Sequence, residues 1–241
     1  MQCLILAGGL GTRMLGVDPS LPKTLLTVAG RPFADWQLRW LAGQGVDSVV
    51  YSIGHKGDQI RAFVGDGSNW GVEVGFVEET DGLLGTGGAI RLAADQGVLD
   101  EHFFVLYGDS YLRVDLKDVD ASFAERGLPA LMTVFANDGQ WDTSNVVFDG
   151  TLVVEYRKGL TTPPPAMRFI DYGLLVLRRE LVTRSIPAGR PSDLAELLEP
   201  LSLRSQLGAY EVRQRFFEIG SPQGIEELDR FLTDEGVTPP G

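Results

Sequence analysis

The amino-acid sequence predicts an α/β protein with a doubly wound sheet that is mixed but mainly parallel. Over the first 140 residues, short apolar runs of strand length alternate with segments whose apolar residues recur at helical spacing. A glycine-rich turn follows the first strand, at the kind of strand end where α/β proteins form their sites. The chain has 241 residues, which fits one large domain. These features are typical of a Rossmann-like fold.

The expected elements follow from local apolar periodicity. In the first half, the predicted strands are 2–6, 48–52, 72–78, 103–107 and 130–135, and the predicted helices are 33–41, 57–64, 89–96 and 116–125. From about residue 141 the chain becomes rich in strands separated by turns, at 145–148, 152–156 and 172–177.

The second half also contains segments that cannot belong to strands. The dipeptide Asp149-Gly150 predicts a hairpin turn, and the proline-rich segment 161–165 predicts a loop. Helices are expected again at 193–203 and 223–232, and the tail from Asp234 is expected to fray. No linker divides the chain, so we expect a single domain with halves at about 1–140 and 141–232.

Composition excludes several functions. The net charge is -12 without a basic stripe, which argues against nucleic acid and acidic membrane surfaces as partners. A single cysteine, Cys3, excludes an internal disulfide framework, suits the cytosol and is expected to be a buried residue of the first strand. No apolar run approaches the length of a membrane span, and we expect a cytoplasmic protein.

Residues 4–24 carry the most informative motif, an apolar strand followed by glycines, an arginine and a Pro-Lys pair. Glycine lets the backbone bring its N–H groups close to an anion, and Arg13 and Lys23 add two cations. The dinucleotide fingerprint needs glycine where Met14 stands, and the P-loop needs glycine where Pro22 stands. The remaining pattern, G-G-x-G-T-R and then P-K, predicts a triphosphate site, with tight turn packing and solvated cations as the alternative.

Five further motifs extend this pattern in the same order along the chain: V-A-G-R-P-F at 28–33, G-T-G-G-A at 85–89, G-D-S at 108–110, I-D-Y-G at 170–173 and E-I-G-S-P at 218–222. Together they make residues 2–232 resemble the sugar-1-phosphate nucleotidyltransferases. The branch that the motifs resemble most is that of the D-glycero-D-manno-heptose 1-phosphate guanylyltransferases. The resemblance implies the nucleotide-diphospho-sugar transferase fold, with a nucleotide half at about 1–140 and a β-rich sugar half at about 141–232 that includes the C-terminal helices.

The implied reaction joins a nucleoside triphosphate to a sugar 1-phosphate and releases pyrophosphate. The attacking phosphate oxygen is already ionised, so no general base is needed, which agrees with a chain of only two histidines. By resemblance, Arg13 holds the triphosphate and Lys23 contacts the α-phosphate or the sugar phosphate. The backbone amides expected to cradle the nucleotide are those of Ala7, Gly8, Gly9, Gly11 and Thr12.

Two carboxylates are expected to hold Mg²⁺. Asp109 follows an apolar strand at its carboxyl end, where a carboxylate suits Mg²⁺, although a turn cap is the alternative. The second ligand in the family is the aspartate of a D-I-G-T-P segment, and here that position is Glu218. The extra methylene changes the metal geometry, and we expect Glu218 to act directly or through water.

The base and the sugar are assigned to other motifs. Glu78, with Glu79 as the second choice, is expected to accept from guanine N1–H and N2–H₂, which favours GTP, and a surface position at the strand end is the alternative. The backbone at Gly87 and Gly88 is expected to contribute to the nucleotide site. By resemblance, Lys158 binds the sugar phosphate, Tyr172 and Gly173 line the sugar ring, and Asn145 reaches a sugar hydroxyl. Gly108 is assigned to the same sugar-phosphate site, and Trp141 is expected in the core or a lid rather than against the sugar.

Three alternatives remain open. A related enzyme would use UTP or dTTP with a hexose or N-acetylhexosamine 1-phosphate. The second alternative is a catalytically silent nucleotide-sugar-binding module, which would have no need of Arg13, Lys23 and Asp109 together. The third is a glycosyltransferase, which would be expected to show an Asp-x-Asp motif that residues 108–110 lack. The expected partners are the two substrates, with neither nucleic acid nor membrane, and an exposed sheet edge in the second half is compatible with a homodimer.

Overall fold

The computed structural model describes residues 1–9, 19–80 and 82–234, and its elements confirm the α/β class. The chain divides into two compact units. Residues 1–83, 106–111 and 216–241 form the first unit, and residues 84–105 and 112–215 form the second. Each unit therefore contains segments from both halves of the sequence.

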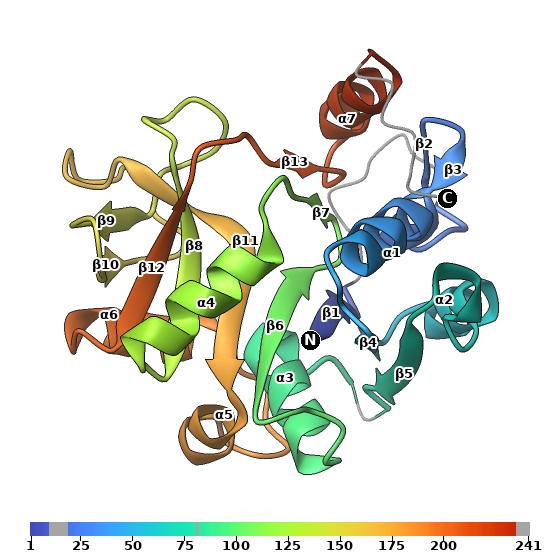
Figure 1. Ribbon diagram of the computed structural model, residues 1–241, viewed down its shortest axis with the longest axis horizontal. Helices are drawn as coiled ribbons and strands as arrows, with labels where there is room; N and C mark the ends of the chain where they lie inside the picture. The colour runs from blue at the N-terminus through green and yellow to red at the C-terminus, as the bar shows by residue number, and fades with distance from the viewer. Residues whose placement is uncertain (10–18, 81, 235–241) are drawn as a thin grey trace. The chain divides into compact units, whose positions relative to one another are not determined.

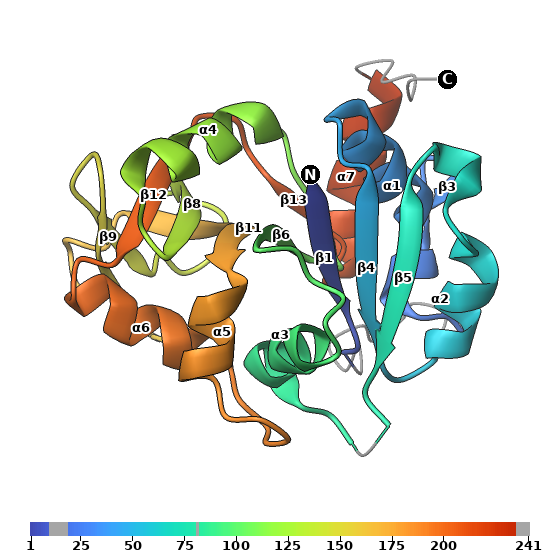
Figure 2. The ribbon, with the colours of Figure 1, turned by 60° about the horizontal axis from the view of Figure 1, so that its bottom comes forward.

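The first unit is organised around three parallel strands that lie side by side: β1 (Gln2–Ala7), β4 (Ser48–Ile53) and β5 (Glu73–Glu78) (Figures 1 and 2). Gln2 is opposite Ser48, which in turn is opposite Glu73. Because the strands are parallel and in register, Ala7, Ile53 and Glu78 end at one edge of the sheet. The last residues of β6 (His102–Tyr107) also belong to this unit, and the Gly108 N–H donates to the Leu6 carbonyl over 3.0 Å.

Three helices accompany these strands, namely α1 (Phe33–Gly43), α2 (Gly57–Val64) and α7 (Pro222–Asp234). The short elements of the unit are the 3₁₀ turns η1 (Lys23–Leu25) and η2 (Ser68–Trp70) and the strands β2 (Thr27–Val28), β3 (Arg31–Pro32), β7 (Ser110–Tyr111) and β13 (Phe217–Glu218). β2 pairs antiparallel with β3, and β7 pairs antiparallel with β13.

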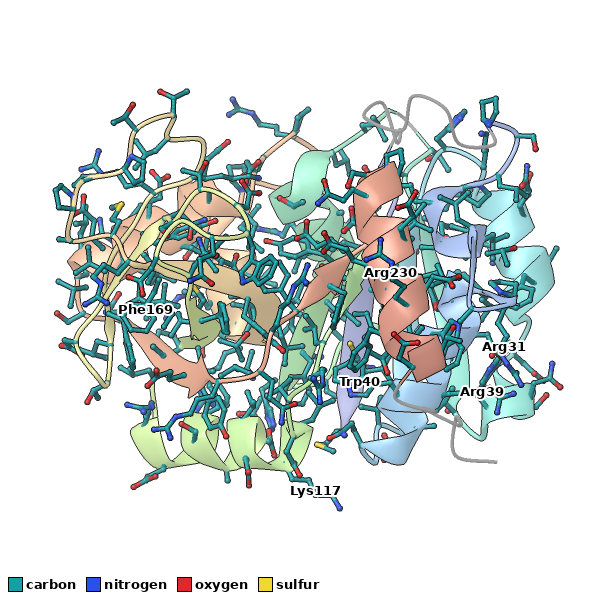
Figure 3. All side chains as sticks on the ribbon, turned by 90° about the horizontal axis from the view of Figure 1, so that it is seen from above. Arg31, Arg39, Trp40, Lys117, Phe169 and Arg230 are labelled. Carbon is teal, nitrogen blue, oxygen red and sulfur yellow. The ribbon has the colours of Figure 1, made fainter. Side chains whose placement is uncertain are left out.

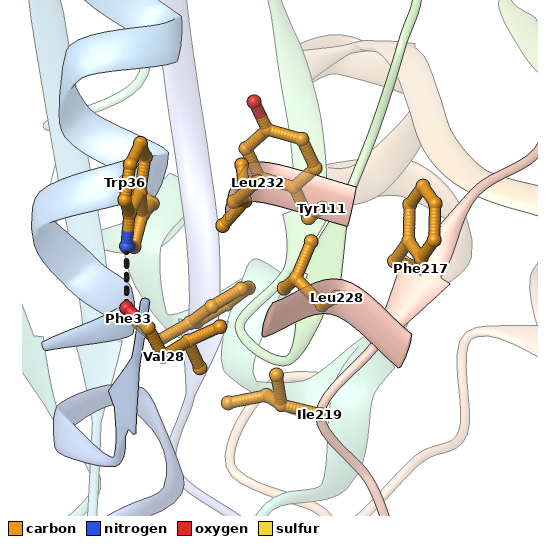
Figure 4. Packing of buried hydrophobic residues seen from close by; sticks show 8 residues of the cluster. All are labelled: Val28, Phe33, Trp36, Tyr111, Phe217, Ile219, Leu228 and Leu232. Atoms are coloured by element: carbon orange, nitrogen blue, oxygen red, sulfur yellow. Dashed lines mark hydrogen bonds between the residues drawn. The ribbon is translucent and has the colours of Figure 1, made fainter. Parts of the chain in front are cut away.

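A buried cluster joins the C-terminal segment to the N-terminal part of this unit (Figure 4). Its members come from β2, α1, β7, the β13 segment and α7, and they are Val28, Phe33, Trp36, Tyr111, Phe217, Ile219, Leu228 and Leu232. The Trp36 indole N–H donates to the Val28 carbonyl over 2.8 Å, so its polar atom is satisfied inside the cluster. Burying each large side chain stabilises the fold by about 1.5–3 kcal/mol, which fixes β13 and its Glu218 next to β7.

Asp35 of α1 ties several surface elements together. Its carboxylate accepts hydrogen bonds from Arg31 over 3.1 Å, from Arg39 over 2.9 Å and from the Trp70 indole over 2.8 Å. Figure 3 shows Arg31 and Arg39 close together at one side of this unit. Burial alone would raise the pKa of Asp35, but these three donors hold that pKa below its ordinary value. The carboxylate therefore stays ionised and attaches β3 and η2 to α1.

The second unit contains a mixed group of strands: β8 (Ala130–Ala136), β9 (Val146–Phe148), β10 (Val153–Tyr156), β11 (Phe169–Arg178) and β12 (Leu207–Val212). β8 pairs parallel with β12 and antiparallel with β11, and β9 pairs antiparallel with β10 and β11. Its helices are α3 (Gly85–Asp95), α4 (Leu116–Arg126), α5 (Arg179–Ser185) and α6 (Ala195–Leu203). Figure 2 shows α4 on one face of these strands and α5 and α6 on the other.

Most predicted elements are present, with differences at their ends. α3 begins at Gly85 rather than at residue 89, so the glycine-rich motif forms the first turn of that helix. α6 begins at Ala195, because Asp193 caps it from outside by accepting from the Ala195 N–H over 2.9 Å. α5 and β12 were not predicted. Within the part of the chain that the structure describes, no helix combines the length and the apolar character that a membrane crossing requires.

Candidate active-site residues in each unit

The chain leaves β1 at a crowded strand end. A β-carbon built on Gly8 would lie 2.5 Å from Glu79 Oε1 and 3.5 Å from the Gly54 nitrogen. A β-carbon on Gly54 would in turn lie 3.0 Å from the Gly8 oxygen. The backbone after β1 therefore passes directly against the backbone after β4 and the Glu79 carboxylate after β5. Of the other predicted residues of this turn, Ala7 and Gly9 are described, while Gly11, Thr12 and Arg13 lie outside the described residues.

Lys23 follows a segment that is hydrogen-bonded to Lys56, directly before α2, and to Gln59 of α2. The Lys56 ammonium donates to the carbonyls of Pro19 and Leu21, and Gln59 donates to the Ser20 carbonyl over 3.1 Å. Lys23 then opens η1, directly after Pro22, whose extended backbone precedes the turn. The Lys23 ammonium lies 3.5 Å from Asp109 Oδ2, so the structure brings these two predicted residues together.

The turn that carries Asp109 is held from several sides. A β-carbon on Gly108 would lie 2.6 Å from the Leu6 oxygen, so only glycine fits where β6 ends against β1. The fully buried Gln37 of α1 donates through Nε2 to the carbonyls of Tyr107 over 3.3 Å and Ser110 over 2.9 Å, one on each side of Asp109. Sequence reasoning missed Gln37. A glutamine on the apolar face of a helix was the available indication, since buried amides need partners.

Glu218 reaches the same turn through the β7–β13 pair. Glu218 is opposite Ser110, and the Ile219 N–H donates to the Asp109 carbonyl over 2.9 Å. The Glu218 side chain is exposed. Two carboxylates beside a glycine turn fit Mg²⁺, which takes one or two protein carboxylates and completes its shell with water and substrate phosphates. Among the described residues no group of three or more candidate ligand side chains occurs. The assignment of Asp109 and Glu218 to a metal stays a prediction.

The two candidate base-recognition residues have different surroundings. The Glu78 carboxylate pairs with Arg61 over 3.3 Å, and that guanidinium lies 4.5 Å from the centre of the Phe76 ring. The Glu79 N–H donates to the Ile53 carbonyl over 3.0 Å, and its carboxylate lies against Gly8 as described above. Glu79, the second choice from the sequence, is thus the one next to the glycine-rich turn.

In the second unit, the G-T-G-G motif at 85–88 is hydrogen-bonded to residues 192–194. The N–H groups of Gly87 and Gly88 both donate to the Ser192 carbonyl, over 2.9 and 3.2 Å. The Ser192 N–H donates to the Leu84 carbonyl over 2.9 Å, and the Leu194 N–H donates to Thr86 Oγ1 over 2.8 Å. The assignment of Gly87 and Gly88 to the nucleotide stays a prediction, and their amides serve this internal contact in the structure described.

Lys158 follows β10 and faces α6. Its ammonium lies 2.5 Å from Asp193 Oδ2, and its N–H donates to Glu199 Oε1 over 3.0 Å. Asn145 is also in this unit, and its side-chain oxygen accepts from the Asp171 N–H over 3.0 Å. The assignment of Lys158 to the sugar phosphate and of Asn145 to a sugar hydroxyl stays a prediction.

Tyr172 and Gly173 form the middle of β11. The Tyr172 ring is buried, and its hydroxyl accepts from the Arg113 N–H over 3.0 Å. Burial raises the pKa of Tyr172 to about 12, although the hydrogen bond from Arg113 acts in the opposite direction. Gly173 has a φ of +99° and donates to Asp171 Oδ1 over 3.0 Å. Trp141 is not in the core, because its indole is 46% exposed and stacks under the Arg215 guanidinium at 3.6 Å.

Asp171 is the second residue that sequence reasoning did not assign. Burial raises the pKa of Asp171 to about 6, although the Gly173 N–H and the charge of Lys158 act in the opposite direction. From the sequence, Asp171 directly precedes the predicted strand 172–177, within the I-D-Y-G motif. Buried ionisable groups with shifted pKa values concentrate at functional sites, which marks Asp171 in the structure.

Comparison with known proteins places these residues in a family. Residues 2–145 match the family model described as nucleotidyl transferase. The chain belongs to the nucleotidyl transferase family. Among curated members, it is 34% identical over 117 residues to the D-glycero-α-D-manno-heptose 1-phosphate guanylyltransferase of Aneurinibacillus thermoaerophilus, covering 48% of this chain and 50% of that protein. It is 24% identical over 230 residues to the UTP–glucose-1-phosphate uridylyltransferase of Synechocystis, covering 90% of this chain and 58% of that protein.

Solved structures are similar to this chain over nearly its whole length. The crystal structure of HddC from Yersinia pseudotuberculosis is similar with a TM-score of 0.79 and 26% identity, over 95% of this chain and 99% of that one. The same protein has been solved in complex with GMP-PN, with a TM-score of 0.78, 25% identity and coverage of 96% and 99%. The chain spans about half to three fifths of the length of the curated relatives it matches.

Proposed function

We propose that this protein is a sugar-1-phosphate nucleotidyltransferase that joins GTP to a heptose 1-phosphate and releases pyrophosphate. The observation that carries the proposal is the 3.5 Å pair of Lys23 and Asp109 beside the glycine-rich end of β1, in a member of the nucleotidyl transferase family. A cation and a carboxylate at a phosphate-binding turn fit phosphoryl transfer, where positioning and charge neutralisation supply the catalysis.

In the proposed reaction, an oxygen of the sugar phosphate forms a bond to the α-phosphorus while the bond to the α,β-bridging oxygen breaks. Lys23 offsets the charge of the two phosphates that must approach each other, and Arg13 takes the charge of the departing pyrophosphate. Asp109 and Glu218 are the residues that would hold Mg²⁺, which when bound neutralises phosphate charge and orients the oxygens. Among the described residues, nothing lies within 4 Å of a β-carbon built on Gly9, so the backbone there is open to a phosphate.

The preference for guanine rests on the surroundings of Gly8. The Glu79 carboxylate lies against Gly8, and the half-exposed Leu83 side chain lies over Gly54, where a β-carbon would be 3.5 Å from Leu83 Cδ2. An apolar surface beside a carboxylate suits a purine with two adjacent donors, as guanine N1–H and N2–H₂ are. Uracil and thymine present one donor between two acceptors, which a carboxylate would partly repel.

Glu79→Gln is therefore expected to lower kcat/KM for GTP by about tenfold, because one charge-assisted hydrogen bond is worth about 1.5–3 kcal/mol. kcat/KM for UTP should change less than threefold in the same variant. Glu78→Gln is the matched control, since Glu78 pairs with Arg61 instead, and it should leave both values within twofold. A larger loss in Glu78→Gln than in Glu79→Gln would contradict the assignment.

The named alternatives differ in the donor and the sugar. Relatives of this chain are named as uridylyltransferase and thymidylyltransferase as well as guanylyltransferase, which supports the class more strongly than the base. Pyrophosphate release should be measured with GTP, UTP, dTTP and CTP, each with D-glycero-α-D-manno-heptose, mannose, glucose and N-acetylglucosamine 1-phosphates. We expect the highest kcat/KM for GTP with the heptose 1-phosphate. Release with UTP or dTTP alone would overturn the base, and no release with any pair would favour a silent binding module.

A further inference from the structure

Lys158, the proposed ligand of the sugar phosphate, is already in contact with an anion of its own chain. Its ammonium lies 2.5 Å from Asp193 Oδ2, and the two side chains are 49% and 44% exposed. A dianionic phosphate that binds Lys158 must either replace this carboxylate or stay close to it. In both cases Asp193 opposes the phosphate through its negative charge.

The Asp193 carboxylate is the fixed partner of this pair. It accepts from the Ala195 N–H over 2.9 Å at the start of α6 and from the Thr86 hydroxyl of the G-T-G-G motif. The neighbouring residues Ser192 and Leu194 are joined to residues 84–88 by the backbone bonds described above. Lys158 has a long flexible side chain and comes from the loop after β10, so it is the partner that can move.

We propose that Asp193 is a positioning residue that competes with the sugar phosphate for Lys158 and thereby sets the affinity for that substrate. Without substrate, Asp193 holds the ammonium at a defined place beside the G-T-G-G motif. When the phosphate binds, the ammonium exchanges the carboxylate for phosphate oxygens. The inference rests on the proposed function, because it takes Lys158 as the phosphate ligand.

Asp193→Asn tests this competition with little change in shape. The amide oxygen of asparagine can still accept from the Ala195 N–H, so the cap of α6 is kept while the charge is removed. Glu199→Gln is the matched control. It removes an equal charge from α6, which Asp193 directly precedes, but Glu199 accepts from the Lys158 backbone N–H and not from its ammonium. A general effect of net charge would appear equally in both variants.

The experiment measures KM and kcat for D-glycero-α-D-manno-heptose 1-phosphate at saturating GTP, together with calorimetric binding of the same sugar phosphate without nucleotide. Because exposed ion pairs are weak, Asp193→Asn should lower KM and Kd about two- to fivefold with kcat within twofold. Glu199→Gln should change neither by more than about 1.5-fold. The advantage of Asp193→Asn should shrink as the ionic strength rises from about 0.01 M to about 1 M, because salt screens exposed charges.

Two failures can be told apart. If the wild type turns over the sugar phosphate but Asp193→Asn has an unchanged or higher KM, or if Glu199→Gln shows the same gain, the competition is refuted and the proposed function stands. If the wild type neither binds nor turns over any sugar 1-phosphate with any nucleotide, the proposed function is refuted and this inference falls with it. Melting temperatures of the three proteins show whether a change in KM reflects misfolding.

Discussion

Asp109→Asn is expected to lower kcat about a hundredfold or more, because preorganised charge at the reacting phosphates typically contributes two to three orders of magnitude. The carboxylate lies 3.5 Å from the Lys23 ammonium and next to the strand that carries Glu218. In the proposed mechanism it holds Mg²⁺, so the substitution should also raise the Mg²⁺ concentration needed for half-maximal activity. Pyrophosphate release at varied Mg²⁺ measures both effects.

The loss should be confined to chemistry and metal binding. The turn itself is held by hydrogen bonds from the Gln37 side-chain amide and the Ile219 backbone N–H to carbonyl groups, which the substitution does not touch. The melting temperature should therefore stay close to that of the wild type. Binding of GTP without metal should be equal or tighter, because a negative charge beside Lys23 is removed. Calorimetry in the presence of a chelator measures that binding.

Asp58→Asn is a matched control for Asp109→Asn, since Asp58 is exposed on α2 in the same unit and the same charge is lost. It should keep kcat within twofold. If Asp109→Asn retained more than a third of the wild-type kcat, neither the metal role nor the catalytic meaning of its contact with Lys23 would hold.

The parts of this site that the sequence predicts are those encoded locally. β1 and α2 follow from short-range periodicity, and α2 begins and ends where it was predicted. Because parallel strands end at a common edge, an apolar strand followed by Gly108-Asp109 could be expected near the glycine-rich turn after β1. The close approach of Lys23 to Asp109, 86 residues apart in sequence, agrees with that reasoning.

The residues that the sequence does not reveal depend on long-range packing. Gln37 lies on an α1 face that reads as apolar, and its role appears only when β6 and β7 are placed against that helix. The pair of Lys158 and Asp193 joins residues 35 apart, and no local pattern connects them. β12 and α5 are short and lack strong end signals, and β12 is fixed by its pairing with β8.

A shift of one residue at the end of β5 decides whether Glu78 or Glu79 lies against Gly8. Successive residues of a strand point to opposite faces, so the end of β5 determines which carboxylate approaches Gly8. Periodicity places strand ends only within a few residues. The sequence therefore identifies a glutamate at this position without identifying which one. In the structure β5 ends at Glu78, which pairs with Arg61, and Glu79 follows against Gly8.

Asp171→Asn is expected to make the protein more stable at neutral pH and less active. Burial raises the pKa of Asp171 to about 6 in the folded chain, whereas the unfolded chain has the ordinary value near 3.8. Between these two values the folded state keeps a proton that the unfolded state has released. Stability contributed by this group therefore falls as the pH rises from about 4 to about 6, and it stays lower above that range.

The size of the effect follows from the shift. One unit of pKa difference corresponds to about 1.4 kcal/mol, so Asp171→Asn should raise the free energy of unfolding at pH 7.5 by up to about 3 kcal/mol. The gain should vanish near pH 4, where the wild-type carboxyl is protonated. Urea unfolding across this pH range measures it. Asp118→Asn, on the exposed side of α4 in the same unit, should change stability by less than about 0.5 kcal/mol at every pH.

A carboxylate that lowers the stability of the fold points to a role in the site, since stability and function often oppose each other at sites. Asp171 lies next to Asn145 through a 3.0 Å bond, and one of its oxygens accepts from the Gly173 N–H. If Asn145 reaches a sugar hydroxyl, as the resemblance implies, the neighbouring Asp171 carboxylate would accept from the same sugar. Asp171→Asn should then raise KM for the sugar 1-phosphate about tenfold while KM for GTP changes little, because one hydrogen bond to a charged group is worth about 1.5–3 kcal/mol. A variant that gains stability without losing affinity for the sugar 1-phosphate would show that the Asp171 charge does not contribute to sugar binding.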